Sequence, residues 1–367
     1  MKLGQEGRRI ITAFLISRLF VFSVGAIADT HLPKFGHYRS YGHHVLVDMW
    51  IKWDAGWYLT IAREGYSILE GQTSSVGYFP LYPLLVRLGG FFVDPAIAGI
   101  MISNASLLAA ALILHRLFRL DFDADTSHAA IVYLLLFPAS VFYSAIFTES
   151  LFLLLSAASF YQARKNRWMM AGVSGFLASL TRMHGLLLLP ALTVEYLHQR
   201  GYFKSWQGVD RGWKDMAWLA LIPLGTIVFF TYLGVTVGDP AAFIKSQTHS
   251  GRHIMMPFMV FWTSLTVNLC DSELLGVAFT VFGLAVTGLM IRRLRPSYTA
   301  YTISSMAFIV SSSSLVGSHR YVAVVFPVYA VMAMVTENRW LKTLTAAGLA
   351  VTLALFTVGF VNGWSIH

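Results

Sequence analysis

The feature that most constrains this chain is a series of long apolar runs that recurs along its whole length. The first is IITAFLISRLFVFSVGAIA, residues 10–28, in which Arg18 is the single charged residue. An α-helix needs about 17–25 apolar residues to cross a bilayer. Only 12% of the 367 residues are charged, whereas soluble domains average about 25%. The chain is therefore predicted to be an all-α, polytopic integral membrane protein with a single membrane domain over residues 1–367.

The apolar runs predict about eleven transmembrane helices. They cover residues 10–28, 95–115, 128–146, 149–163, 168–181, 184–198, 217–237, 272–291, 298–316, 321–336 and 343–361. Residues 253–270 stay open between a re-entrant or interfacial segment and a further span. Residues 29–94 form a first outer loop, in which FPLYPLLVRLGGFF (79–92) predicts an amphipathic helix on the membrane surface. Residues 238–271 form a second outer loop or re-entrant segment.

The basic residues indicate the orientation of the chain in the membrane. With the N-terminus in the cytoplasm, the predicted inner segments hold 17 of the 27 Lys and Arg residues, as the positive-inside rule requires. The net charge of +9 therefore reflects topology, and no nucleic-acid partner is expected. We predict a multi-pass protein of the plasma (inner) membrane. Its single cysteine, Cys270, excludes an intrachain disulfide framework, and the lack of a Gly-rich phosphate loop argues against a nucleotide-driven pump.

Ionisable residues near the predicted membrane are functional candidates by default, because burying their charge in lipid is costly. Arg18 lies near the middle of the first span. Three tight turns or span ends on the outer face carry the other candidates. Glu149 lies in the first, Arg182 and His184 lie in the second, and His319 and Arg320 lie in the third. A cation cluster beside apolar helices suits a phosphate with a lipid tail, and a carboxylate suits a base that acts on a hydroxyl. For each residue alone, snorkelling or helix capping stays an alternative.

Residues 52–66, KWDAGWYLTIAREGY, place Asp54 between two tryptophans in the first outer loop. Asp54 is either a solvated loop residue or part of a site on the outer face. We expect Trp53, Trp57 and Tyr58 to anchor the loop at the membrane interface, with stacking on a sugar as the alternative. His249 and His253 lack a third well-spaced ligand, so no metal site is predicted.

Several of these segments together resemble the PIG-V mannosyltransferase family. That family comprises the second mannosyltransferase of glycosylphosphatidylinositol (GPI) assembly and its shorter prokaryotic relatives. The most specific match is WDAGWYLTIAREGY (53–66) followed by YFPLYPLLVR (78–87). The matching segments also include FPASVFYSAIFTESLFLLLS (137–156), SLTRMHGLLLLP (179–190), SHRYVAVVFP (318–327) and SRL (17–19). The family belongs to the GT-C superfamily of polytopic glycosyltransferases, so the resemblance implies a GT-C-like fold.

The resemblance also implies a reaction. Mannose would pass from polyprenyl-phosphate-mannose to an acceptor hydroxyl of a glycolipid, glycan or protein on the outer face, with inversion. In GT-C enzymes an acidic residue of the first outer loop is catalytic, and by its place in the motif this role falls on Asp54. Asp48 and Glu149 are the alternatives. The cations expected at the donor phosphate are Arg182, His319 and Arg320, with Lys245 and Arg252 in reserve. No cofactor is expected, and a divalent metal is not obligatory.

Two other classes of protein remain as alternatives. A secondary transporter or lipid flippase is also polytopic and carries intramembrane charges, but many transporters consist of two similar halves with charges at the membrane midplane. This sequence has no convincing internal repeat, and its charges gather on one face. A non-catalytic scaffold would leave the large outer loops unexplained. The sequence therefore favours a membrane glycosyltransferase.

Overall fold

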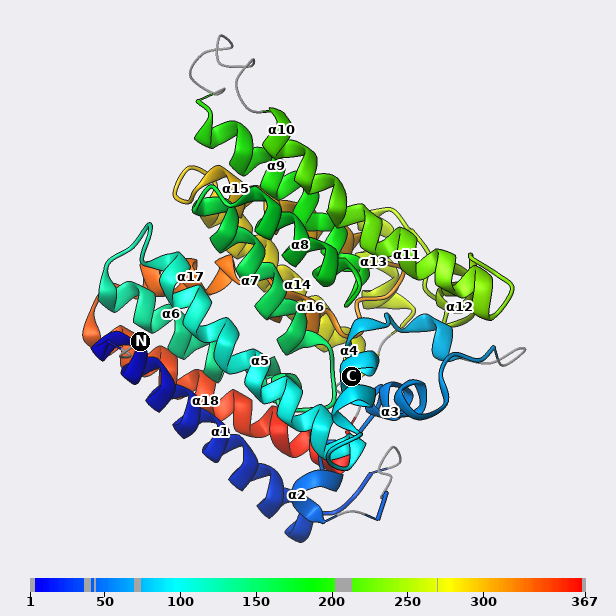
Figure 1. Cartoon of the computed structure of the whole chain (residues 1–367). Helices are drawn as coiled ribbons and strands as arrows, with labels where there is room; N and C mark the ends of the chain where they lie inside the picture. The colour runs from blue at the N-terminus through cyan, green and yellow to red at the C-terminus, as the bar shows by residue number, and fades with distance from the viewer. Residues whose placement is uncertain are drawn as a thin grey trace.

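The structure is a computed structural model, and it describes residues 4–35, 41–42, 44–68, 74–201, 213–268 and 270–364. Within these residues every regular element is a helix, and the β-pairing is limited to one isolated bridge between Ile254 and Ser312. The predicted all-α class is confirmed (Figure 1). The α-helices are α1 Gln5–His31, α2 Val45–Asp48, α3 Ala55–Glu64, α4 Leu81–Gly89, α5 Pro95–Phe118, α6 Ala124–Leu136, α7 Glu149–Arg164, α8 Trp168–Ser179, α9 Leu188–Gln199, α10 Trp213–Met216, α11 Leu221–Thr236, α12 Ala242–His249, α13 Pro257–Thr266, α14 Asp271–Met290, α15 Pro296–Val310, α16 Ser318–Ala323, α17 Pro327–Val335 and α18 Arg339–Asn362. The short 3₁₀ helices are η1 Ser75–Gly77, η2 Pro138–Tyr143, η3 Met183–Leu187 and η5 Ala217–Ala220.

Five helical stretches in the described part are long and apolar enough to cross a membrane. They are α1, α5, the stretch Lys214–Thr236 that ends in α11, α14 and α18. Each coincides with a predicted span. The chain is therefore a membrane protein, whereas the total of eleven spans stays a prediction.

Two predicted spans are wrong as single helices. The span 128–146 is divided into α6 and η2, because Pro138 cannot continue the hydrogen bonds of α6 and disfavours helical backbone at the residue before it. The span 321–336 is divided into α16 and α17, with Pro327 at the start of the second helix. In the open stretch 253–270, α13 has 10 residues, so it reaches only about 15 Å and cannot cross a bilayer alone.

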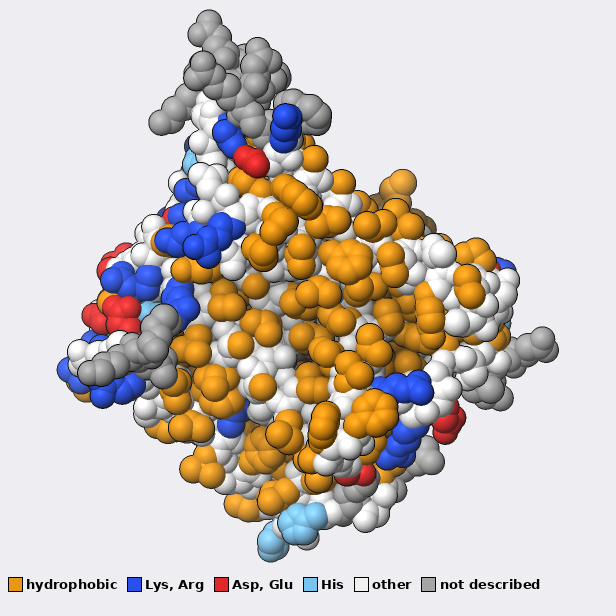
Figure 2. All heavy atoms as spheres, in the orientation of Figure 1, with side chains coloured by type: hydrophobic (Ala, Val, Ile, Leu, Met, Phe, Trp, Pro, Cys, Tyr) orange, Lys and Arg blue, Asp and Glu red, His pale blue; other side chains and the backbone are white. Residues whose placement is uncertain are grey.

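The helices pack into one bundle with an apolar outer surface. The helices α1 and α18 lie side by side, and the N-terminus lies at the left end of α1 (Figure 1). The helix α7 packs between α5 and α8, and α8 packs against α11. Figure 2 shows hydrophobic side chains across the middle of this face, with Lys, Arg, Asp and Glu gathered at its left edge and lower right. A lipid-facing belt between two polar edges has this pattern.

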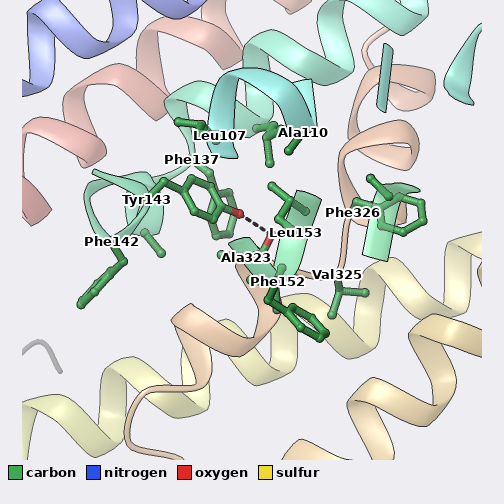
Figure 3. Packing of buried hydrophobic residues seen from close by; sticks show 14 of the residues in the cluster. Leu107, Ala110, Phe137, Phe142, Tyr143, Phe152, Leu153, Ala323, Val325 and Phe326 are labelled. Atoms are coloured by element: carbon green, nitrogen blue, oxygen red, sulfur yellow. Dashed lines mark hydrogen bonds between the residues drawn. The ribbon is translucent and has the colours of Figure 1, made fainter. Parts of the chain in front are cut away.

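The break before α17 fixes the position of α16, which carries Arg320. The Tyr143 hydroxyl of η2 donates to the carbonyl of Ala323 at 2.7 Å (Figure 3). The Tyr329 hydroxyl donates to the same carbonyl at 2.7 Å. Because Ala323 ends α16, these two buried bonds satisfy a carbonyl that the broken helix would otherwise leave unpaired.

Candidate functional site

Four charged side chains from distant segments form one continuous series of ion pairs, which we call the carboxylate–arginine chain. Its members in order are Asp54 before α3, Arg320 in α16, Glu149 at the start of α7, and Arg182 between α8 and η3. Arg320 Nη1 lies 2.9 Å from Asp54 Oδ2, and Arg320 Nε lies 2.7 Å from Glu149 Oε1. Arg182 Nη1 lies 2.8 Å from the same Glu149 oxygen. The structure brings these four residues together from separate turns.

The carboxylate–arginine chain runs from the protein interior to the surface. Glu149 is fully buried, and 9% of the Arg182 side chain and 11% of the Arg320 side chain are exposed. The Asp54 side chain is 31% exposed, the largest share among the four. Asp54 is therefore the member of the chain that a substrate can reach most readily.

The backbone directs the Asp54 carboxylate away from its own helix. Asp54 is the N-cap residue of α3, yet its side chain makes no capping hydrogen bond, although an Asp at this position stabilises a helix by about 1 kcal/mol when it does. The preceding Trp53 has a φ of 53°, a left-handed conformation that costs a bulky residue on the order of 1 kcal/mol. The carboxylate is thus free of the helix cap and bonds to Arg320 instead.

A tyrosine binds the second oxygen of Asp54. Tyr78 Oη donates to Asp54 Oδ1 at 3.2 Å. Burial, followed by the nearby charge of Asp54, raises the pKa of Tyr78 well above its ordinary value. The phenol therefore stays protonated over the physiological pH range and remains a donor to the carboxylate.

A second set of side chains surrounds Tyr321, the residue after Arg320. Arg252 Nη1 donates to Tyr321 Oη at 2.7 Å. The Arg182 guanidinium lies 5.3 Å from the Tyr321 ring centroid, and the His184 ring stacks on the same tyrosine at 4.7 Å. Tyr321 thus connects Arg252 and His184 to the buried end of the carboxylate–arginine chain.

The structure places three other predicted residues elsewhere. Lys245 pairs with Asp239 of its own loop at 2.7 Å and is 67% exposed. His319 is buried and packs against three phenylalanines, Phe142, Phe279 and Phe356. Asp48 is buried in α2 and accepts a hydrogen bond from the Tyr41 amide at 2.8 Å. The structure therefore gives Lys245 and His319 contacts outside the carboxylate–arginine chain.

Arg18 lies inside the helix bundle and contacts a different set of residues. Its Nη1 donates to Ser144 Oγ at 2.9 Å, and its Nη2 donates to the Leu135 carbonyl at 2.9 Å and to Ser140 Oγ at 2.8 Å. Leu135 lies at the end of α6, Ser140 lies in η2, and Ser144 follows η2. Arg18 therefore satisfies the backbone at the break in the predicted span 128–146.

The aromatic residues of the first outer loop are less exposed than expected. Tyr58 is 5% exposed and packs edge-on against Tyr78 and Tyr82, so its expected role as an interfacial anchor is wrong. Trp57 is half-buried and stacks on Tyr78 with ring centroids 6.0 Å apart. These aromatic rings pack together beside Asp54.

Three hydroxyl-bearing residues that contact the carboxylate–arginine chain were not identified from the sequence. Tyr78 opens the YFPLYP motif, Tyr321 follows Arg320, and Thr148 Oγ1 accepts from Arg182 Nη1 at 3.2 Å. All three lie within the segments that carry the family resemblance. Their hydroxyls could have been candidates, but nothing in their spacing indicated the charged groups that they would contact.

Comparisons with known proteins identify what the chain is similar to. A family model described as "Mannosyltransferase (PIG-V)" matches residues 33–235, more than half of the chain. The chain is 30% identical over 180 residues to GPI alpha-1,6-mannosyltransferase 2 of Mus musculus, covering 45% of this chain and 34% of the mouse protein. It is 28% identical over 259 residues to the Rattus norvegicus protein of the same name, covering 63% of this chain and 51% of the rat protein. The chain thus spans between a third and a half of these curated relatives.

Among solved structures, ArnT from Cupriavidus metallidurans has a similar fold. The apo structure of ArnT matches with a TM-score of 0.58 and 14% identity, covering 97% of this chain and 77% of ArnT. The structure of ArnT bound to undecaprenyl phosphate matches with a TM-score of 0.55 and 13% identity, covering 97% of this chain and 76% of ArnT. At this identity the likeness is one of fold: the helices of this chain are arranged as in ArnT.

Proposed function

Because the chain belongs to the mannosyltransferase (PIG-V) family, we propose that it transfers mannose from polyprenyl-phosphate-mannose to an acceptor hydroxyl. The acceptor is a glycolipid, a glycan or a protein on the outer face of the plasma (inner) membrane. The observation that carries the proposal is the carboxylate–arginine chain, which joins a partly exposed carboxylate to buried guanidinium groups. The partly exposed carboxylate suits an acceptor hydroxyl, and the buried guanidinium groups suit an anion.

Asp54 acts as the general base. The acceptor oxygen attacks the anomeric carbon while Asp54 takes the hydroxyl proton, and the bond from that carbon to the phosphate oxygen breaks on the opposite face. The configuration therefore inverts. A positioned base of this kind contributes about 10²–10⁴-fold in rate. The hydrogen bonds from Tyr78 to Oδ1 and from Arg320 to Oδ2 hold the carboxylate in one orientation.

Arg182 and Arg320 bind the phosphate that leaves. The leaving phosphate gains negative charge in the transition state, so fixed cations stabilise that state more than the bound donor. Arg252 lies within the same group through Tyr321 and supplies a third cation. A lipid-phosphate donor is further supported by ArnT, a protein of similar fold whose structure contains undecaprenyl phosphate.

The reaction needs no divalent metal in this proposal. The Arg320 guanidinium bonds to the carboxylates of both Asp54 and Glu149, at 2.9 and 2.7 Å. Arg320 thus bonds to both carboxylates, and Arg182 supplies the second positive charge that balances them.

The proposal is tested with purified protein in detergent. Polyprenyl-phosphate-mannose labelled in the sugar is incubated with membrane lipid and glycan extracts, with and without EDTA. We expect label in a new product at equal rates in both samples. Comparing the glycans of a deletion strain with its parent then identifies the acceptor. A protein that moves the donor across vesicles but transfers no label is a transporter, and this result would contradict the proposal.

A further inference from the structure

The site contains a carboxylate for which the proposed reaction has no direct use. Glu149 has no exposed surface, so it contacts substrate only through other residues. Its Oε1 bonds to both Arg182 and Arg320. Its Oε2 is buried with no hydrogen-bond partner among the described residues. A buried charge with an unsatisfied oxygen is costly to the fold.

The net charge of the site indicates what Glu149 contributes. The carboxylates of Asp54 and Glu149 balance the guanidinium groups of Arg182 and Arg320, and Arg252 leaves the group with one net positive charge. Neutralising Glu149 would leave two. The released polyprenyl phosphate is a monoester with about 1.5–2 negative charges near neutral pH. Each added positive charge would therefore raise the affinity of the site for the released polyprenyl phosphate.

We propose that Glu149 is a positioning residue that balances the charge of the phosphate site. It holds Arg182 and Arg320 as a pair on one oxygen, and its own charge limits how tightly that pair retains polyprenyl phosphate after transfer. This inference rests on the proposed function, because it assigns the regulation of the same phosphate site. The N-terminus of α7 helps to keep Glu149 charged, since helix N-termini stabilise negative charge.

The sign of one mutational effect separates this role from a purely structural one. If Glu149 only stabilised the fold, Glu149→Gln would loosen the arginine pair and weaken phosphate binding. If Glu149 balances charge, the same variant binds phosphate more tightly, because a repulsive charge close to the ligand has been removed. Over a few ångströms at an effective dielectric constant of about 20, this removal tightens binding at least about tenfold.

The probe is undecaprenyl monophosphate in detergent, with affinity measured by intrinsic tryptophan fluorescence. For Glu149→Gln we expect a dissociation constant about tenfold below that of wild type. We also expect a lower kcat and stronger inhibition by added undecaprenyl monophosphate in the transfer assay. Equal or weaker binding than wild type would overturn the inference.

Two further variants serve as controls. Glu195 is also fully buried and bonds to Arg295 at 2.8 Å through each of two nitrogens, but its partners lie outside the carboxylate–arginine chain. Glu195→Gln should lower thermal stability and leave the affinity for undecaprenyl monophosphate unchanged. Glu149→Asp keeps the charge and should bind the probe with nearly wild-type affinity. If it binds as tightly as Glu149→Gln, charge is not the cause.

A second background keeps the inference testable if Glu149→Gln does not fold. In Arg182→Gln the charge of the pair is already reduced, so adding Glu149→Gln restores the balance and should still tighten binding about tenfold relative to Arg182→Gln alone. No tightening in this background would contradict the inference. Wild-type protein that fails to bind undecaprenyl monophosphate would instead refute the proposed function itself, and this inference with it.

Discussion

At the scale of the residue, Arg320 determines how the site works. It bonds to Asp54 through Nη1 and to Glu149 through Nε, and its guanidinium lies 4.6 Å from the Phe147 ring centroid. The planar group with several fixed donors can join two carboxylates and a ring at once, which the single ammonium group of lysine cannot. In the proposed reaction, Arg320 therefore orients the base and fixes the position of the phosphate site.

Substitution of the two buried arginines should weaken the use of the lipid-phosphate donor. Hydrogen bonds to charged groups contribute about 1.5–3 kcal/mol each, so we expect Arg182→Gln and Arg320→Gln to raise the KM for the donor about 10- to 100-fold. The measurement is the initial rate of transfer against donor concentration. Lys245→Gln is the matched control, because Lys245 pairs with Asp239 on the surface, and its donor KM should not change. Unchanged donor KM in both arginine variants would remove them from the phosphate site.

The charged residues of the site could be predicted from the sequence, but the contacts that each side chain makes could not. Asp54, Glu149, Arg182 and Arg320 stood out because charges are costly beside apolar spans, and topology placed them on one face. The sequence could not show that Lys245 has a nearer partner in Asp239, or that His319 lies among phenylalanines. Those outcomes depend on side-chain packing between segments far apart in the chain.

At the scale of the element, the turn before α16 depends on α14. Glu273 in the first turn of α14 accepts from the Leu315 amide at 2.9 Å and from Ser314 Oγ at 2.9 Å. One turn further along, Gly276 lies directly against this segment. A Cβ added at Gly276 would lie 2.0 Å from the carbonyl oxygen of Leu315. The close approach of these two backbones therefore requires a glycine.

The Gly276→Ala variant should displace this turn and Arg320 with it. Because overpacking costs about 1–3 kcal/mol, we expect a lower unfolding temperature in detergent and a reduced rate of transfer. Gly288 lies in the same helix with nothing within 4 Å of an added Cβ, so it provides the control. Gly288→Ala should leave the unfolding temperature unchanged or raise it, since alanine favours a helix by about 0.5–1 kcal/mol. Equal behaviour of the two variants would contradict the proposed contact.

The elements themselves were predictable where one apolar run makes one helix, as in α1, α5, α14 and α18. Hydrophobic periodicity failed at α6 and α16, because a buried broken helix is as apolar as a continuous one. Pro138 and Pro327 were the available signals of a break. The partners that make the breaks tolerable, Arg18 and Tyr143, come from other segments and could not be identified from local sequence.

At the scale of the whole molecule, the proposed outer site requires one orientation of the protein in the membrane. The positive-inside distribution predicts a cytoplasmic N-terminus and an outer site. The five long apolar helices and the ArnT-like fold agree with a membrane protein. The all-α class and the mannosyltransferase (PIG-V) family could be predicted, because long apolar runs and the motifs of the first outer loop are local signals. The packing order of the helices could not.

The natural cysteine gives a direct test of orientation. Cys270 is the sole cysteine of the chain and is exposed at the start of α14. A membrane-impermeant maleimide should label it in intact cells, or in spheroplasts if a cell wall blocks access, without permeabilising the membrane. In a Cys270→Ser background, Lys342→Cys should be labelled only after permeabilisation. The reverse pattern would place the site in the cytoplasm and contradict the proposed outer face.

The central claim is that Asp54 is the base, and its most direct test is the turnover of purified Asp54→Asn. Asparagine keeps the size of the side chain and cannot accept the acceptor proton. We predict that transfer falls by about 10²–10⁴-fold, while the variant still inserts in the membrane and binds undecaprenyl monophosphate. Asp48→Asn should retain turnover in its folded fraction, because Asp48 is buried in α2 and bonds to the Tyr41 amide. Wild-type turnover in Asp54→Asn would contradict the account.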